Sequence, residues 1–181
     1  MAAVQTPPLA LRAEALAAER RFERSSIPEV GRLLAVLAAG RTRLAESGTG
    51  TGYGAAWLAS GMAADAGLVT VEPNPDLAAV AAELFADDPR VTVVHGDARD
   101  VLPPLAPFDL LFLDGGPWKQ EPEERLLELI APGGVVVMDD LTPGRPGPDP
   151  VRQFWLDHPR VLATELLTTP TTAAIVAARL P

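Results

Sequence analysis

The chain has 181 residues, a net charge of −9 at neutral pH and 48% apolar residues, the composition of one globular domain with a sizeable core. It contains no cysteine, which excludes disulfides and thiolate metal sites, and no apolar run approaches the ~20 residues of a membrane-spanning helix. The acidic body disfavours general nucleic-acid binding and the N-terminus lacks a secretory signal pattern, so we expect a cytoplasmic protein that binds neither membrane nor nucleic acid.

Two helices are predicted in the N-terminal part, residues 1–40. Residues 9–24 are rich in Ala, Leu, Glu and Arg, which favour a helix. Ser26 is a suitable N-cap for a second helix with Pro28 in its first turn, and Gly40 is expected to end that helix. Together with an α/β core over 41–181, this predicts a single domain that spans 1–181.

A glycine-rich stretch, Glu46-Ser-Gly-Thr-Gly-Thr-Gly-Tyr-Gly54, follows a short predicted strand (42–45) and precedes a predicted helix (55–62). Glycines can adopt positive φ and allow the backbone to approach a nucleotide-like ligand closely. The strict dinucleotide pattern G-x-G-x-x-G fits poorly and is weak by itself. The stretch therefore indicates a ligand-binding loop but does not name the ligand.

Two carboxylates narrow the choice of ligand. Glu72 ends the next predicted strand (68–71), twenty positions after Gly52, where a carboxylate can accept both hydroxyls of a ribose. NAD and S-adenosylmethionine both carry a ribose. Glu46 favours S-adenosylmethionine, because a carboxylate would repel a pyrophosphate but not a sulfonium ligand with an amino group.

Strands and helices alternate through the rest of the chain, which is typical of a doubly wound α/β sheet. Asp97 follows the third strand, where a carboxylate can accept from an adenine amino group. Residues 141–150 hold four prolines and two glycines and are expected to form a loop over the site. We expect helices at 75–85 (capped by Asn74), 121–130 and 151–157, and strands at 91–94, 108–113, 135–138, 161–167 and 171–177, the last two as an antiparallel edge.

Several motifs in order resemble those of class I S-adenosylmethionine-dependent methyltransferases, and in particular the small O-methyltransferases of the catechol and caffeoyl-CoA type. They are the glycine stretch, Val71-Glu72, Gly96-Asp97-Ala98, Phe108-Asp-Leu-Leu-Phe-Leu-Asp114 and Val137-Met-Asp-Asp140. The resemblance implies a Rossmann-like, mostly parallel seven-stranded sheet with an antiparallel last strand and helices on both faces. It also implies cofactor-binding residues, namely Glu46, Gly48, Gly50, Gly52, Tyr53, Glu72, Asp97, Ala98 and Asp114.

The same resemblance bears on a metal and on a base. Catechol-type enzymes bind a divalent ion, usually magnesium, at strand ends that correspond to Asp114, Asp139 and Asp140, and three carboxylates suit a hard cation. An Asn is usual where Asp140 stands. The family's general-base lysine corresponds to Lys119, the only lysine in the chain, although Gly115-Gly116-Pro117 makes its spacing from Asp114 two residues longer than usual.

The sequence thus predicts methyl transfer from S-adenosylmethionine to a hydroxyl of a small molecule, with metal assistance if the carboxylates bind an ion. Relatives commonly form homodimers, which this sequence does not test. Two alternatives remain open: a non-catalytic protein that keeps the cofactor-binding fold, and an NAD(P)-dependent oxidoreductase. The second lacks a catalytic Tyr-Lys pair, because the single tyrosine, Tyr53, lies in the glycine stretch itself.

Overall fold

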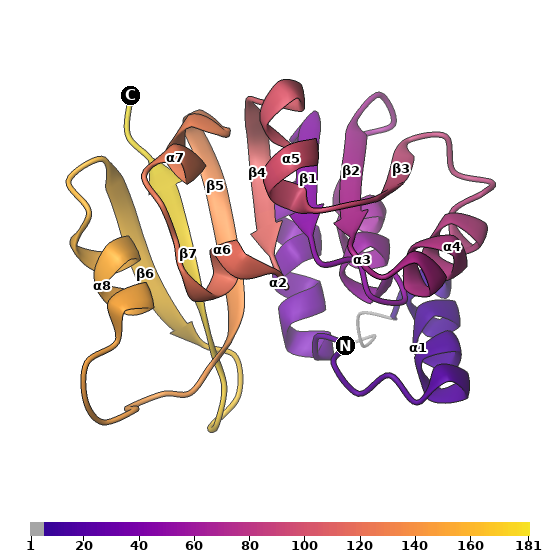
Figure 1. The fold of residues 1–181 in the computed structure, drawn as a ribbon, viewed down its shortest axis with the longest axis horizontal. Helices are drawn as coiled ribbons and strands as arrows, with labels where there is room; N and C mark the ends of the chain where they lie inside the picture. Colours follow the sequence, from indigo (N-terminus) through magenta and orange to yellow (C-terminus); the bar gives the residue numbers. More distant parts are fainter. Residues whose placement is uncertain (1–5) are drawn as a thin grey trace, which may run out of the picture.

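A computed structural model describes residues 6–181 and contains one seven-stranded sheet in the order β3-β2-β1-β4-β5-β7-β6 (Figure 1). Strands β1 to β5 are parallel, and β7 pairs antiparallel with both β5 and β6. The strands are β1 (Arg43–Ser47), β2 (Gly67–Glu72), β3 (Val91–His95), β4 (Phe108–Leu113), β5 (Ile130–Leu141), β6 (Val161–Leu167) and β7 (Ala173–Arg179). The predicted doubly wound sheet with an antiparallel edge is confirmed, and β6 rather than β7 is the edge strand.

Helices cover both faces of this sheet. They are α1 (Pro8–Arg20), α2 (Pro28–Ala38), α3 (Tyr53–Gly61), α4 (Pro75–Leu84), α5 (Ala98–Val101), α6 (Pro117–Gln120), α7 (Arg125–Glu128) and α8 (Pro150–Asp157), with a 3₁₀ turn at Pro103–Leu105. Asn74 accepts from two backbone N–H groups of the first turn of α4, so its predicted role as an N-cap is confirmed. None of the helices in residues 6–181 is long and apolar enough to cross a membrane.

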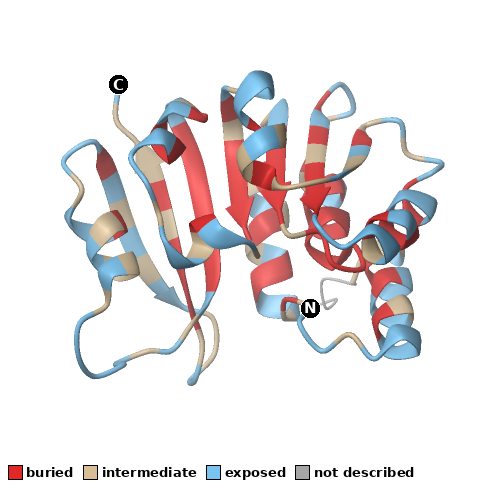
Figure 2. Cartoon of the chain, in the orientation of Figure 1, coloured by how far each residue is buried: buried red, intermediate tan, exposed pale blue. Residues whose placement is uncertain are grey.

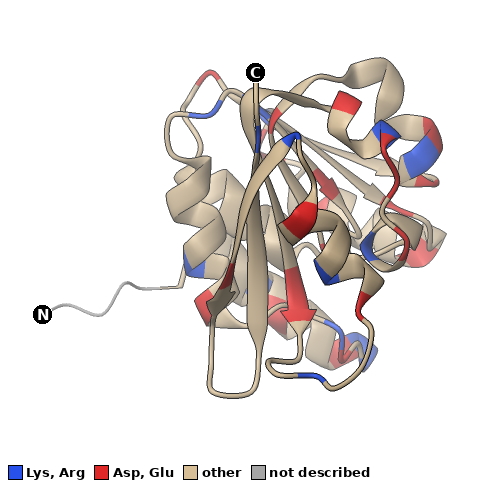
Figure 3. Ribbon diagram, turned by 90° about the vertical axis from the view of Figure 1, so that its left-hand side faces the viewer, with Lys and Arg blue, Asp and Glu red and all other residues tan. Residues whose placement is uncertain are grey.

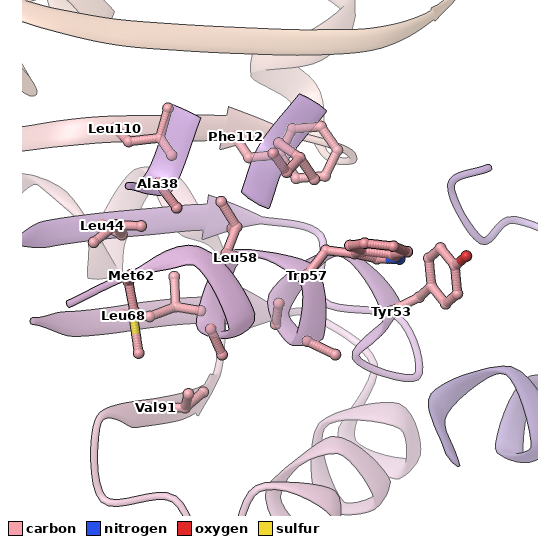
Figure 4. Close-up of a cluster of buried hydrophobic side chains, with 14 of the residues drawn as sticks. Ala38, Leu44, Tyr53, Trp57, Leu58, Met62, Leu68, Val91, Leu110 and Phe112 are labelled. Atoms are coloured by element: carbon pink, nitrogen blue, oxygen red, sulfur yellow. The ribbon is translucent and has the colours of Figure 1, made fainter. Parts of the chain in front are cut away.

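Alternating side chains of the central strands build two separate cores. On β4, Leu110 and Phe112 belong to the cluster that contains α1, α2 and α3, whereas Leu111 and Leu113 belong to the cluster that contains α5 to α8. In Figure 2 the central strands of the sheet are mostly red, which marks buried residues, whereas the edge strands β3 and β6 are mostly tan and pale blue. Figure 4 shows the first cluster, in which Trp57 of α3 lies beside Tyr53.

Helices α2 and α3 pack closely because each presents a glycine to the other. A Cβ on Gly31 of α2 would overlap the indole of Trp57, and a Cβ on Gly61 of α3 would overlap the backbone carbonyl oxygen of Ala35. This packing fixes α3 against the sheet. Since the glycine-rich loop leads directly into α3, the same packing positions the loop.

The prediction of one helix over 121–130 is wrong. The structure contains only a single turn, α7, and β5 already begins at Ile130, which pairs with Phe108 of β4. Pro122 lacks the backbone N–H that a helical hydrogen bond needs. From Ile130 onward the chain pairs with β4 and is therefore a strand. A short helix, α6, precedes this region and was not predicted.

Candidate active site

A cavity of about 620 Å³ opens beside the C-terminal ends of β1 and β2. Its walls are the loop 48–54, the turn 72–74, residues 114–116 and the N-terminal segment 21–25. In a doubly wound sheet this edge is where ligands bind. The predicted glycine loop therefore lies where the sequence placed it, and the segment between α1 and α2 closes the cavity from the other side.

The glycines of the loop are required by its path. Gly48 has φ +98°, and a Cβ there would come within 2.6 Å of the backbone nitrogen of Gly115. Gly52 has φ +94° and is the N-cap of α3. Residues with a side chain rarely adopt such φ values, so the loop can hold this compact path only with glycine at both positions.

Glu72 joins the loop to the following turn. Its side chain is buried, and its two carboxylate oxygens accept from the backbone N–H of Gly50 at 2.8 Å and of Asn74 at 3.0 Å. Glu72 also lines the cavity. A carboxylate in this position can both fix the loop and receive hydroxyl groups of a ligand.

Glu46 lies behind the loop and does not line the cavity. Its carboxylate is fully buried, accepts from the hydroxyl of Thr70 and lies against Gly54, where a Cβ would overlap its Oε1. Within residues 6–181 this Oε1 has no hydrogen-bond partner. Burial raises the pKa of Glu46 well above its usual range, which the Thr70 hydrogen bond offsets in part. Glu46 thus supports the loop from inside the protein.

Tyr53, the first residue of α3, lines the cavity and packs edge-on against Trp57, with ring centroids 6.4 Å apart (Figure 4). Asp97 and Ala98, by contrast, do not line it. Asp97 caps α5 by accepting from the backbone N–H of Arg99, and it pairs with the Arg99 guanidinium at 3.0 Å. This guanidinium lowers the pKa of Asp97.

A second cavity, of about 770 Å³, adjoins the first. The two share residues 23–25 and 114–116 as a common wall. The second cavity is further lined by Lys119, by Asp139 and Asp140 at the end of β5, by much of the loop 141–150 and by the start of α8. Figure 3 shows acidic residues, in red, at the arrowhead ends of strands on this side. The Pro-rich loop thus lines the cavity that contains the predicted metal ligands.

Lys119 lies among the three carboxylates predicted as metal ligands. Its Nζ donates to Asp139 Oδ1 at 2.8 Å, to Asp140 Oδ2 at 2.9 Å and to the backbone oxygen of Asp114 at 2.8 Å, and it lies 3.6 Å from Asp114 Oδ1. Lys119 therefore reaches the site despite its longer spacing. Burial alone lowers the pKa of Lys119, but the charges of the three carboxylates outweigh burial and raise it. The ammonium is charged in this arrangement and cannot accept a proton.

The pKa values of two of these carboxyl groups are raised as well. Burial and the neighbouring Asp139 raise the pKa of Asp114 to about 8, although Lys119 opposes this shift. Burial also raises the pKa of Asp139, against the effect of Lys119. The lysine thus compensates only part of the cost of placing these carboxylates together.

Asp140 has a backbone conformation that brings it to the same side as Asp139. Its φ is +62°, and the pairing of β5 with β7 shifts register between Met138 and Leu141. Adjacent residues of a regular strand point to opposite faces, but this irregularity allows both carboxylates to reach Lys119. Asp is one of the few residue types that tolerate positive φ.

Two parts of the site were not predicted. The hydroxyl of Ser26 donates to Asp139 Oδ2 at 3.0 Å, so its prediction as an N-cap is wrong; Ile27 occupies that position. Arg152 of α8 donates to Asp149, to Glu165 and to the backbone oxygen of Thr142, and so ties the loop over the second cavity to α8 and β6. Neither long-range contact leaves a local signal in the sequence.

The chain is similar in sequence to known methyltransferases. Residues 45–141 match a family described as a methyltransferase domain. A protein of Mycobacterium avium, named provisionally as an O-methyltransferase, is 36% identical over 133 residues, which cover 68% of this chain and 60% of that protein. The chain thus spans about 60% of the length of the curated relatives it matches.

Solved structures extend the similarity to nearly the whole chain. One of them is the O-methyltransferase TomG of Streptomyces achromogenes, which is involved in tomaymycin synthesis and was solved in complex with SAM. It is 27% identical to this chain, with a TM-score of 0.82, and the match covers 99% of this chain and 93% of that one. Cofactor-bound Rv0187 from MTB is 27% identical with a TM-score of 0.84 over 98% and 92%. With more than half of its residues matched by the family, the chain belongs to the methyltransferase domain family.

Proposed function

We propose that this protein transfers a methyl group from S-adenosylmethionine to a hydroxyl of a small molecule. The observation that carries the proposal is the shared wall at Asp114–Gly116, which separates a cavity beside the glycine loop from a cavity beside Lys119. Two ligands bound in adjoining cavities can meet at this wall, as a group transfer requires. The similarity to TomG, solved with SAM, supports the choice of cofactor.

The first cavity has the chemistry to hold this cofactor. Its floor is glycine backbone, which allows close approach, and Glu72 offers carboxylate oxygens to a ribose. Tyr53 and Phe22 add apolar surface. The hydroxyl of Ser25, which lies in the shared wall, has no hydrogen-bond partner within residues 6–181 and is available to a bound ligand.

Asp97 and Ala98 remain proposed adenine contacts. For Asp97 to receive an adenine amino group, its pairing with Arg99 must change or the carboxylate must accept both partners. Glu46 is proposed to act through the loop that it supports.

When bound, S-adenosylmethionine supplies an electrophilic methyl group on a sulfonium centre. The acceptor oxygen would take up this methyl group and lose its proton to a base or to water, and S-adenosylhomocysteine would be the other product. The protein's part is to orient the two ligands across the shared wall and to exclude water with the loop 141–150. Lys119 lines the second cavity, which we take as the acceptor cavity, but its ammonium can donate to the acceptor oxygen only after it gives up one of its present hydrogen bonds. It can serve as the base only in a state in which it has left the carboxylates and lost its proton.

Asp114, Asp139 and Asp140 are the ligands that we propose for a divalent cation such as Mg²⁺. One oxygen of each carboxylate lies within 4.8 Å of the others, and a set of oxygen ligands at this spacing suits a hard cation. Such an ion would lower the pKa of an acceptor hydroxyl. The donor set fits the ion, but the ammonium of Lys119 already lies inside it.

Calorimetric titration of the purified protein with S-adenosylhomocysteine and, separately, with NAD tests the cofactor. We expect micromolar binding of S-adenosylhomocysteine only. A screen of mono- and dihydroxylated aromatic acceptors with S-adenosylmethionine then follows methyl gain by mass spectrometry, with and without Mg²⁺. Binding of NAD without binding of S-adenosylhomocysteine would overturn the proposal, and cofactor binding without turnover of any acceptor would favour a non-catalytic role.

A further inference from the structure

The Lys119 ammonium uses its full hydrogen-bonding capacity within the carboxylate cluster, which we define as Asp114, Asp139 and Asp140. An ammonium has three N–H donors. Each has an acceptor here at 2.8–2.9 Å, two of them carboxylate oxygens and one the backbone oxygen of Asp114. The lysine side chain is 15% exposed. It is thus held as a cation inside the cluster rather than extended into the acceptor cavity.

The same cluster cannot hold this ammonium and a divalent ion together. An ion bound to these oxygens would lie about 2.0–2.6 Å from each, and the ammonium nitrogen lies 2.8–3.6 Å from an oxygen of every carboxylate. The two cations would be only a few ångströms apart in a partly buried site, where their repulsion is strong. They would also need the same lone pairs of Asp139 and Asp140.

Lysine has a route out of the cluster. The side chain has four rotatable bonds, and Lys119 itself lines the cavity of about 770 Å³ beside it. Trp118, which precedes it, is buried and anchors α6 while the lysine moves. The side chain can therefore leave without unfolding of the helix.

We propose that the Lys119 ammonium and a divalent cation are alternative occupants of the carboxylate cluster, so that an ion enters only by displacing Lys119 into the acceptor cavity. This inference rests on the cation site proposed above. Lys119 then competes with the ion for the carboxylates and so weakens ion binding. When the ion binds, the Lys119 side chain lies in the acceptor cavity, and when it does not, the side chain lies in the cluster. The cluster retains a counter-cation in either state.

Amine labelling of the unaltered protein tests the displacement directly, because Lys119 is the only lysine of the chain. Acetic anhydride labelling followed by peptide mass spectrometry reports the accessibility of Nζ, and the α-amino group is an internal control. We expect Lys119 labelling to rise at least about threefold as Mg²⁺ saturates the site, while labelling of the α-amino group stays constant. Unchanged Lys119 labelling at saturating Mg²⁺ would overturn the inference.

Mn²⁺ affinity, measured by electron paramagnetic resonance, tests the competition. Lys119→Met removes the charge and keeps the length of the side chain, so we expect Mn²⁺ to bind at least about tenfold more tightly. Arg145→Met removes an exposed cation from the same cavity and should change the affinity by less than about threefold. The double variant Lys119→Met/Asp139→Asn should lose the gain, because the ion then lacks a ligand.

The outcomes distinguish this inference from the proposals on which it rests. If Lys119→Met binds Mn²⁺ no more tightly than the unaltered protein, lysine and ion do not compete. If neither binds Mn²⁺ but both bind S-adenosylhomocysteine, the cation site and this inference fail while the proposed cofactor stands. A Lys119→Met variant that melts at a lower temperature and recovers with Mn²⁺ would support alternative occupancy, and the labelling experiment decides the question if that variant does not fold.

Discussion

Replacement of Glu72 by Gln separates its two proposed roles, support of the glycine loop and binding of a ribose. The carboxylate accepts from the backbone N–H groups of Gly50 and Asn74 at 2.8 and 3.0 Å. The glutamine amide has only one acceptor oxygen, so its nitrogen would face one of these two donors. We therefore expect the free protein to lose about 1.5–3 kcal/mol of stability, the usual contribution of one hydrogen bond to a charged group.

The same substitution should also weaken binding of the cofactor. If Glu72 accepts from a ribose hydroxyl, loss of that charged hydrogen bond corresponds to roughly 10- to 100-fold weaker binding of S-adenosylhomocysteine. Urea unfolding measures the first effect and isothermal titration calorimetry the second. Glu83→Gln is the matched control, since Glu83 is exposed on the neighbouring α4, and it should alter neither quantity appreciably.

One result would refute the reasoning about the ribose. If Glu72→Gln is destabilised as expected but binds S-adenosylhomocysteine within twofold of the unaltered protein, Glu72 serves only to hold the loop. If neither stability nor affinity changes, the two backbone hydrogen bonds contribute less than their geometry suggests.

Three further predictions concern the packing, the loop and the buried carboxylates. Gly61→Ala places a methyl group against the backbone oxygen of Ala35 and should cost about 1–3 kcal/mol by urea unfolding; an unchanged midpoint would show that α2 and α3 can separate freely. Arg152→Met removes the side chain that ties the loop 141–150 to Glu165, so amide hydrogen exchange should accelerate there and not in α3, and equal protection would contradict this role. The pKa of Asp114 is raised to about 8, so stability from its protonated form is present at pH 4 and is lost as the pH rises through 8. The melting temperature of Asp114→Asn, relative to that of the unaltered protein, should therefore increase from pH 5 to pH 8 in metal-free buffer, and a pH-independent difference would refute the shifted titration.

The sequence by itself determined the order of the elements and the position of the loop, because both depend on local patterns. The apolar run 108–113 predicted a central strand with the bounds observed for β4, since strands buried on both faces are apolar throughout. Asn74 followed by Pro75 predicted the start of α4, because a cap acts on backbone groups two or three residues away. The closely spaced glycines predicted a loop with positive φ for the same local reason.

Only the tertiary structure decided how the site is arranged, because its contacts join residues far apart in the chain. Ser26 has the sequence context of a cap, but a carboxylate 113 residues away receives its hydroxyl instead. Glu46 lies behind the loop rather than in the cavity, with Gly54 of α3 packed against its side chain.

In the carboxylate cluster, too, the sequence determined one part and the tertiary structure another. Its three aspartates were predicted from the resemblance to catechol-type enzymes, whose metal ligands lie at strand ends on one edge of the sheet. That Lys119 lies among them depends on the path of the chain after Gly115 and on the irregularity at Asp140, which spacing along the sequence does not reveal. Residue types and motifs therefore pointed to the candidate groups of the site, whereas the partner of each group was set by packing across the whole fold.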